Sequence, residues 1–86
     1  MLSRMQQSTP ALRGPYVRLR LDRFDERARV LDLANDSEIA RKLGLDRAAI
    51  SRVRSGEAQP GERFIAAAVS TLGVSFEYLF EIAQAS

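Results

Sequence analysis

Length and composition already exclude several classes of protein. The chain has 86 residues, 45% of them hydrophobic and 28% charged, which fits one small folded domain rather than a disordered chain. It contains no cysteine and no histidine, and this excludes disulfides, thiolate catalysis, Ser-His-Asp triads and the usual zinc sites. No motif for a metal ion or a cofactor is present, so neither is expected. No apolar segment is long enough to span a membrane or to act as a secretory signal, which predicts a cytoplasmic protein.

The net charge of +2 is the sum of basic and acidic segments. Residues 1–20 carry four arginines and no acid, and residues 39–56 carry five basic residues against Asp46 alone. Residues 21–38 and 57–86 each carry more acids than bases. All but one of the 13 basic residues are arginine, whose planar guanidinium suits phosphate groups and guanine edges better than an ammonium group does. This distribution is typical of a protein that binds a polyanion.

The N-terminal part of the chain combines a polar segment with a short alternating one. Residues 1–14 show no periodicity and are predicted to form a flexible arm, which leaves 15–86 as the folded domain. In Tyr16–Leu21, apolar residues alternate with arginines, which predicts a strand with one buried face. A lone strand is unstable, so this one needs a partner. Two partners are open: Leu79–Ala83 of the same chain, or the same strand of a second subunit.

Helical periodicity and capping residues predict five short helices in the rest of the chain. Their bounds follow from Ser, Asp or Asn residues that can cap a first turn and from glycines that can end a last turn. The helices are expected from Asp22 to about Asp32, from Asn35 to Gly44, from Asp46 to Ser55, from the end of the loop 57–61 to Gly73, and from Ser75 onward. The predicted fold class is therefore mainly α, a compact five-helix bundle, with a short two-stranded sheet if the N- and C-terminal segments pair.

The segment Ser37–Gly56, SEIARKLGLDRAAISRVRSG, is the most informative part of the sequence. Its spacing suits two short helices that pack at a steep angle through a tight turn, because Ala40 is small and Gly44 allows the backbone to reverse. Apolar residues of both helices fill their contact: Ile39, Leu43, Ile50 and Val53. The outer side of the second helix then carries small and basic residues: Arg47, Ala48, Ser51, Arg52 and Arg54. A helix mounted in this way fits the major groove of DNA, which is about 12 Å wide.

This segment resembles the helix-turn-helix of the phage Cro/repressor family, also called the Xre family. The matching residues are I-A-R-K-L-G-L-D-R-A-A-I-S-R-V-R-S-G, followed by E-R-F-I at the start of the next helix, and the resemblance extends over about residues 22–80. It implies a bundle like that of lambda repressor and a DNA-binding regulator of transcription, with a double-stranded operator as its partner. A homodimer is expected as well, because one short recognition helix rarely suffices and two-fold pairs are the rule.

The resemblance and the exposed helix face together give the expected DNA contacts. Four residues of the recognition helix are expected to contact bases: Arg47, Ala48, Ser51 and Arg52. Four residues at its end and in the next helix are expected to contact the DNA backbone: Arg54, Ser55, Gly56 and Arg63. The alternative for each arginine is a solvated surface charge, and for Ser55 and Gly56 it is a role in ending the helix.

Three acids depart from the family pattern. Asp36 stands where many members have a glutamine that contacts the DNA backbone, and an anion at that position would repel phosphate. We expect Asp36 instead to interact with the helix dipole or to hold an arginine such as Arg47. Glu57 and Glu62 stand where relatives are often basic. These departures predict modest non-specific affinity for DNA, with more weight on a few arginines.

Three functions from different classes fit these observations. The leading one is a sequence-specific, nucleoid-associated regulator, most simply a phage or mobile-element repressor that acts by occlusion, because the chain has no room for a ligand-sensing domain. The second is an antitoxin, in which the same DNA-binding core carries a tail or strand that grips a toxin protein. The third is a helical interaction module that no longer binds DNA. An enzyme is not expected, because no acid–base pair, activated nucleophile or phosphate-binding loop is present.

Overall fold

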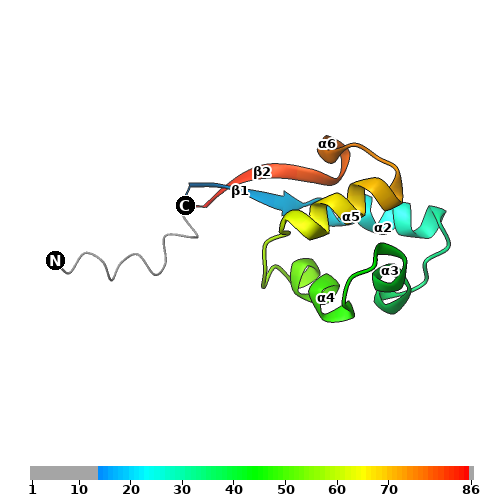
Figure 1. Cartoon of the computed structure of the whole chain (residues 1–86). Coiled ribbons are helices and arrows are strands. Elements are labelled where there is room, and N and C mark those ends of the chain that lie inside the picture. Colours follow the sequence, from blue (N-terminus) through cyan, green and yellow to red (C-terminus); the bar gives the residue numbers. More distant parts are fainter. Residues whose placement is uncertain (1–13, 86) are drawn as a thin grey trace.

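The two ends of the described chain meet in a small antiparallel sheet. The computed structural model describes residues 14–85, and Figure 1 shows how their helices and strands are arranged. Strand β1 (Gly14–Leu19) pairs with strand β2 (Phe80–Ala85). The predicted strand is confirmed, and the structure pairs it with the C-terminal segment of the same chain. Gly14, which the sequence places in the arm, begins β1; the other arm residues lie outside the described part of the chain.

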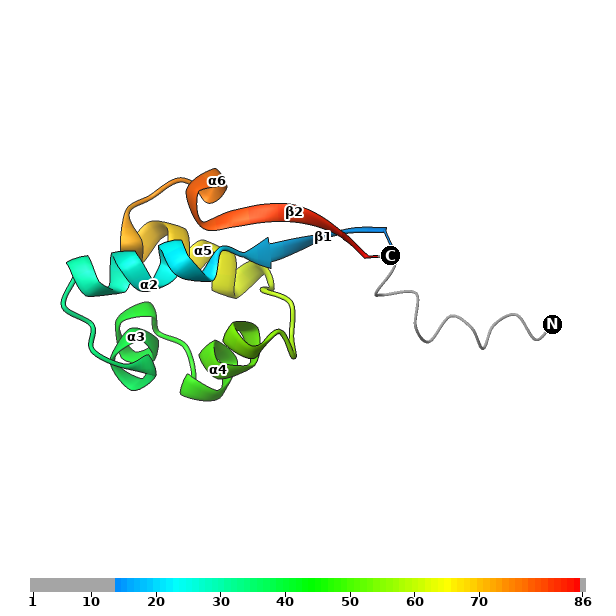
Figure 2. The ribbon, with the colours of Figure 1, turned by 180° about the vertical axis from the view of Figure 1, so that it is seen from behind.

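Five helices lie between the two strands in the sequence and form a bundle. In chain order they are α2 (Leu21–Val30), α3 (Asp36–Leu43), α4 (Arg47–Ser55), α5 (Glu62–Leu72) and α6 (Phe76–Leu79). Figures 1 and 2, which view the molecule from opposite sides, both show α2 and α5 between the two-stranded ribbon and the α3–α4 pair. The mainly α fold with a two-stranded sheet is therefore confirmed.

The junction between β1 and α2 differs from the prediction. Leu21, expected at the end of the strand, is the first residue of α2, and the N-cap is Arg20 rather than Asp22. The Phe24 amide donates to the Arg20 carbonyl over 3.0 Å, which closes the first helical turn. Leu21 satisfies both patterns, since it continues the alternation of the strand and also stands three residues before the buried Phe24. The alternation of apolar residues and arginines, taken alone, therefore predicts the end of the strand too far along the chain.

Three phenylalanines from distant parts of the chain form the centre of the core. Phe24 of α2, Phe64 of α5 and Phe80 of β2 are each no more than 5% exposed. The ring centres of Phe24 and Phe64 are 6.0 Å apart, and those of Phe64 and Phe80 are 6.4 Å apart. Aromatic pairs at such distances add about 0.5–1.5 kcal/mol each to the energy of burial. Ile50 of α4 belongs to the same core, so the bundle as a whole fixes the position of α4.

Candidate nucleic-acid interface

The turn between α3 and α4 is fixed by backbone hydrogen bonds around Gly44. Gly44 adopts the left-handed conformation, with φ 75°, and its amide donates to the Arg41 carbonyl over 3.3 Å. The Leu45 amide donates to the Ala40 carbonyl over 2.9 Å, so the last carbonyls of α3 are satisfied. Ala40 and Ile50 are 4% and 1% exposed where the two helices contact the core. These residues build the pair of helices that the sequence predicts.

The outer side of α4 is exposed along its length. It carries the four residues that the sequence assigns to base contacts: Arg47, Ala48, Ser51 and Arg52. Arg47 and Arg52 are five residues apart, which places them about 140° apart around the helix axis. They therefore flank the surface on which the two small residues lie. Within residues 14–85, neither arginine side chain has a hydrogen-bond acceptor or an acid partner.

The ten arginines of the described chain fall into two equal groups. Five donate to other groups of the fold: Arg18, Arg20, Arg23, Arg27 and Arg54. The first two pair with Glu81, and the next two donate to carbonyl oxygens of α6 and α5. The other five have no side-chain partner among residues 14–85: Arg29, Arg41, Arg47, Arg52 and Arg63. Four of these five lie on α3, α4 and the start of α5, and Arg29 lies on α2. The charge count along residues 39–56 already indicates the α3–α4 part of this basic region, and the structure removes Arg54 from it and adds Arg63.

Arg54, the last arginine of α4, is held by two carboxylates. Its Nη1 donates to the two oxygens of Asp25 over 2.9 and 3.2 Å, and its Nη2 and Nε donate to Asp36 over 2.8 and 3.2 Å. Its guanidinium carbon lies 5.8 Å from the ring centre of Phe24. Partial burial alone would lower the pKa of Arg54, but its hydrogen bonds to Asp36 and Asp25 outweigh this effect and raise the pKa above its usual value. We call these three charged residues the Arg54 cluster; it ties α4 to α2 and α3.

The Arg54 cluster also gives Asp36 its partner. Asp36 was expected to interact with the helix dipole or to hold an arginine such as Arg47; it does hold an arginine of α4, but that arginine is Arg54, at the other end of the helix. Asp36 is the first residue of α3, where a negative charge interacts favourably with the helix dipole, as expected. Because its charge is balanced, Asp36 repels a nearby phosphate less than the sequence suggests. The phosphate contact expected of Arg54 stays a prediction, and its pairing with two acids does not favour it.

Ser55 and Gly56 end α4 through their own hydrogen bonds. The Ser55 Oγ donates to the Arg52 carbonyl over 3.2 Å and accepts from the Glu57 amide over 3.4 Å. Gly56 is left-handed, with φ 84°, and its amide donates to the Val53 carbonyl over 3.2 Å. Both residues therefore help to end α4, which is the role that the sequence offered as the alternative to a DNA contact. Their contacts to a DNA backbone stay predictions.

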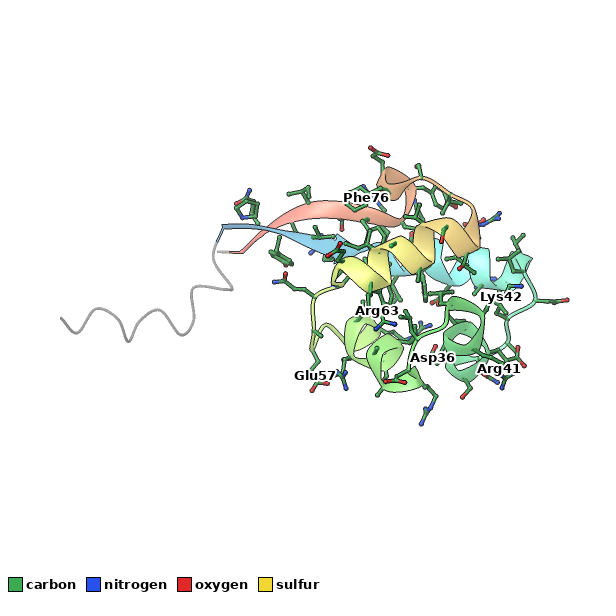
Figure 3. The ribbon with its side chains drawn as sticks, viewed as in Figure 1. Asp36, Arg41, Lys42, Glu57, Arg63 and Phe76 are labelled. Atoms are coloured by element: carbon green, nitrogen blue, oxygen red, sulfur yellow. The ribbon has the colours of Figure 1, made fainter. Side chains whose placement is uncertain are left out.

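Arg63 approaches α4 from the first turn of α5. Figure 3 shows its side chain between α5 and α4. Arg63 and Arg52 line one surface hollow, formed by the turn before α4 with Asp46, by α4 itself, by the loop after it and by the start of α5. Arg41 and Lys42 lie on the side of α3 that faces away from α4, and Glu57 is exposed on the loop after α4 (Figure 3). The positive side chains nearest to the exposed face of α4 therefore come from α4 itself and from α5.

Asp25 is the residue of this region that sequence reasoning missed. It stands 29 residues before Arg54, and nothing in the sequence around either residue indicates the pairing. Asp25 follows the buried Phe24 on α2, and this position brings its carboxylate to the edge of the core beside α4. Only the packing of α2 against α4 could reveal it.

The comparisons with known proteins agree with this geometry. A family model described as helix-turn-helix matches residues 28–79, which is more than half of the chain. The chain therefore belongs to this family of Cro/Xre-type helix-turn-helix proteins, which are DNA-binding regulators of transcription. No curated protein and no solved structure matches the chain.

No helix of residues 14–85 has the length and apolar composition needed to cross a bilayer. The same residues contain no group of acidic side chains that could hold a metal ion.

Proposed function

We propose that the chain binds a specific site on double-stranded DNA and represses transcription by occlusion, as a phage or mobile-element repressor does. The observation that carries this proposal is the contrast on α4. Its exposed face presents Arg47 and Arg52 without acid partners, while Arg54 is bound to two acids that hold the helix in place. An exposed helix whose arginines were all paired within the fold could not supply such contacts.

In the proposed complex, α4 enters the major groove. Arg47 and Arg52 each donate to O6 and N7 of a guanine, which is the commonest arginine contact with a base. The methyl group of Ala48 meets a thymine methyl between them, and Ser51 hydrogen-bonds to a base edge. Ser55, Gly56 and Arg63 contact phosphates beside the groove and set the position of the helix. Arg54 supports α4 from the side of the bundle.

We propose further that the protein acts as a homodimer on DNA in the cytoplasm. One helix as short as α4 reads only a few base pairs, and helix-turn-helix proteins usually gain affinity by placing two such helices on two half-sites. Two copies related by a two-fold axis would require a site that is an inverted repeat.

Selection from random duplex DNA, followed by sequencing, tests the proposal. The expected result is an enriched inverted repeat with two G·C pairs fixed in each half-site, bound far more tightly than random duplex. Affinity should also fall steeply with salt, because each phosphate contact releases counterions. Failure to enrich any sequence, together with affinity that is independent of salt, would refute DNA binding and leave a protein-interaction module.

The antitoxin alternative shares the DNA-binding core and adds a second partner. It predicts a stoichiometric complex with a toxin protein encoded beside this chain. Co-expression with the neighbouring small reading frame, followed by co-purification, distinguishes it from a repressor that acts alone.

A further inference from the structure

Among the arginines of α4, Arg54 alone is bonded to acids of residues 14–85. Each nitrogen of its guanidinium donates to a carboxylate: Nη1 to Asp25, and Nη2 and Nε to Asp36. Two parallel N–H groups that meet one carboxylate, as they do at Asp36, combine charge with a fixed orientation. The guanidinium of Arg54 is therefore already held inside the fold before any ligand arrives.

The acids of the Arg54 cluster outnumber its cation. Asp25 and Asp36 carry two negative charges against the single positive charge of Arg54. One carboxylate is enough to neutralise an arginine, so the second leaves the cluster with one negative charge. A group of that charge does not attract a phosphate. The cluster therefore contributes nothing to the attraction of DNA, although it contains an arginine.

The cluster lies at the surface, beside the residues proposed to contact the DNA backbone. The side chains of Arg54, Asp25 and Asp36 are 28%, 37% and 26% exposed, and Figure 3 shows Asp36 between α3 and α4. Arg54 lines one surface hollow with its two acids and a second hollow with Ser55 and Gly56. An arginine released from its acids at this position would lie next to the same stretch of DNA backbone as Ser55 and Gly56.

We propose that Asp25 and Asp36 limit the strength of DNA binding by keeping Arg54 away from phosphate. This inference rests on the proposed function and gives the two acids a role in binding that needs no contact with DNA. A phosphate contact carries no sequence information, so the acids lower the affinity for every DNA sequence alike and leave base reading by Arg47 and Arg52 unchanged. The protein thereby binds random DNA less tightly than its arginine content suggests.

The test compares the salt dependence of DNA binding in a cycle of four full-length proteins. They are the wild type, Asp25→Asn/Asp36→Asn, Arg54→Met, and the triple variant that combines these substitutions. Asparagine keeps the shape of aspartate and removes its charge, so the double variant releases Arg54. Fluorescence anisotropy on a short duplex of random sequence gives the affinity at several salt concentrations. The double variant should bind more tightly than the wild type.

The slope of log affinity against log salt separates a new phosphate contact from a simple loss of charge. In the presence of Arg54, the two asparagine substitutions should make the slope steeper by about one unit more than they do in the Arg54→Met background. The ratio of the affinities for the selected site and for random duplex should stay at its wild-type value, because the added contact is made to phosphate.

Two exposed acids of α2 provide a matched control for the loss of charge. Asp22→Asn with Glu26→Gln removes the same two negative charges, and neither acid pairs with an arginine side chain within residues 14–85. This control should keep nearly the wild-type slope. Circular dichroism checks that each variant is folded under the assay conditions. Asp25→Asn alone, which keeps the bonds to Asp36, should shift the slope in the same direction by less and serves if the double variant does not fold.

Three results would overturn the proposal while leaving DNA binding intact. Equal slope changes with and without Arg54, or an equal change in the α2 control, would mean that loss of charge alone accounts for the effect. A lower ratio of selected-site to random-duplex affinity in Asp25→Asn/Asp36→Asn would mean that the acids act on base reading. A wild-type protein that binds no DNA would instead refute the proposed function, and this inference with it.

Discussion

The first and last turns of α4 carry arginines on the same side of the helix, yet these arginines are in different states. Arg47 and Arg54 are seven residues apart, which places them within about 20° of each other around the axis. Arg47 is exposed without an acid partner among the described residues, whereas Arg54 is half-buried and bound to two carboxylates. The last turn packs beside Asp25 of α2, and the first turn has no such neighbour. Whether an arginine of α4 is free to contact DNA therefore depends on which residues pack beside its turn of the helix.

The largest expected effect is on stability, at Ile50, where α4 packs against the core between its first and last turns. Ile50→Ala should lower the free energy of unfolding by about 2–5 kcal/mol, because it leaves a cavity at a residue that is 1% exposed. Urea denaturation measures this loss. The fraction of the variant that remains folded should keep the wild-type preference for the selected DNA site, and a changed preference would mean that Ile50 also positions the exposed face.

The next effect concerns the unpaired arginines on the exposed face. Arg47→Ala and Arg52→Ala should each weaken binding to the selected site by about 1–3 kcal/mol and relax the preference at one base pair. Equilibrium binding to the selected site and to random duplex checks this. If a variant loses the same factor on both DNAs, its arginine contacts phosphate and not a base.

Replacing Arg54, the arginine paired with two acids, should lower the stability of the fold more than replacing an unpaired arginine of α4 does. Arg54→Met leaves Asp25 and Asp36 as two carboxylates without a cation and should lower the free energy of unfolding by about 1–2 kcal/mol, a value reduced because the cluster is partly exposed to solvent. Arg52→Met is the matched control on the same helix and should change stability by no more than about 0.5 kcal/mol.

A triple variant separates the ion pairs from the packing of the Arg54 side chain. Adding Asp25→Asn and Asp36→Asn to Arg54→Met removes the unpaired carboxylates and should restore part of the lost stability, which thermal and urea unfolding would both report. If Arg54→Met and Arg52→Met lower the free energy of unfolding equally, the ion pairs of Arg54 do not stabilise the fold. The distinction between a paired and an unpaired arginine on α4 would then be wrong.

The smallest effect concerns charges outside the described residues. If Arg4 and Arg13 contact DNA, deletion of residues 1–13 should make the slope of log affinity against log salt less steep, by about one to two units. Titrations at several salt concentrations measure the slope. An unchanged slope would assign the phosphate contacts to the folded domain alone.

Much of the helical layout follows from the sequence by itself. The cap at Asn35, the left-handed Gly44 and the exposed positions of Arg47 and Arg52 all agree with the pattern of neighbouring residues. Capping, turn formation and helix periodicity depend on residues within a few positions of each other, so one sequence is enough to predict them. Two local predictions differ from the structure. The start of α2 does so because Leu21 fits the strand and the helix equally well, and Asp46 stands at the N-cap of α4 as expected but its side chain makes no capping hydrogen bond.

Tertiary structure decided which charges are balanced and which edges are covered. Arg54 meets its carboxylates 18 and 29 residues away, and Arg18 meets Glu81 63 residues away, so no local pattern could identify these partners. The sequence left two partners open for β1, and the packing of Phe80 into the core beside Phe64 selected β2. Such contacts exist only once the chain has closed long loops around a shared core, because that is when the gain from burial exceeds the entropy of closing them.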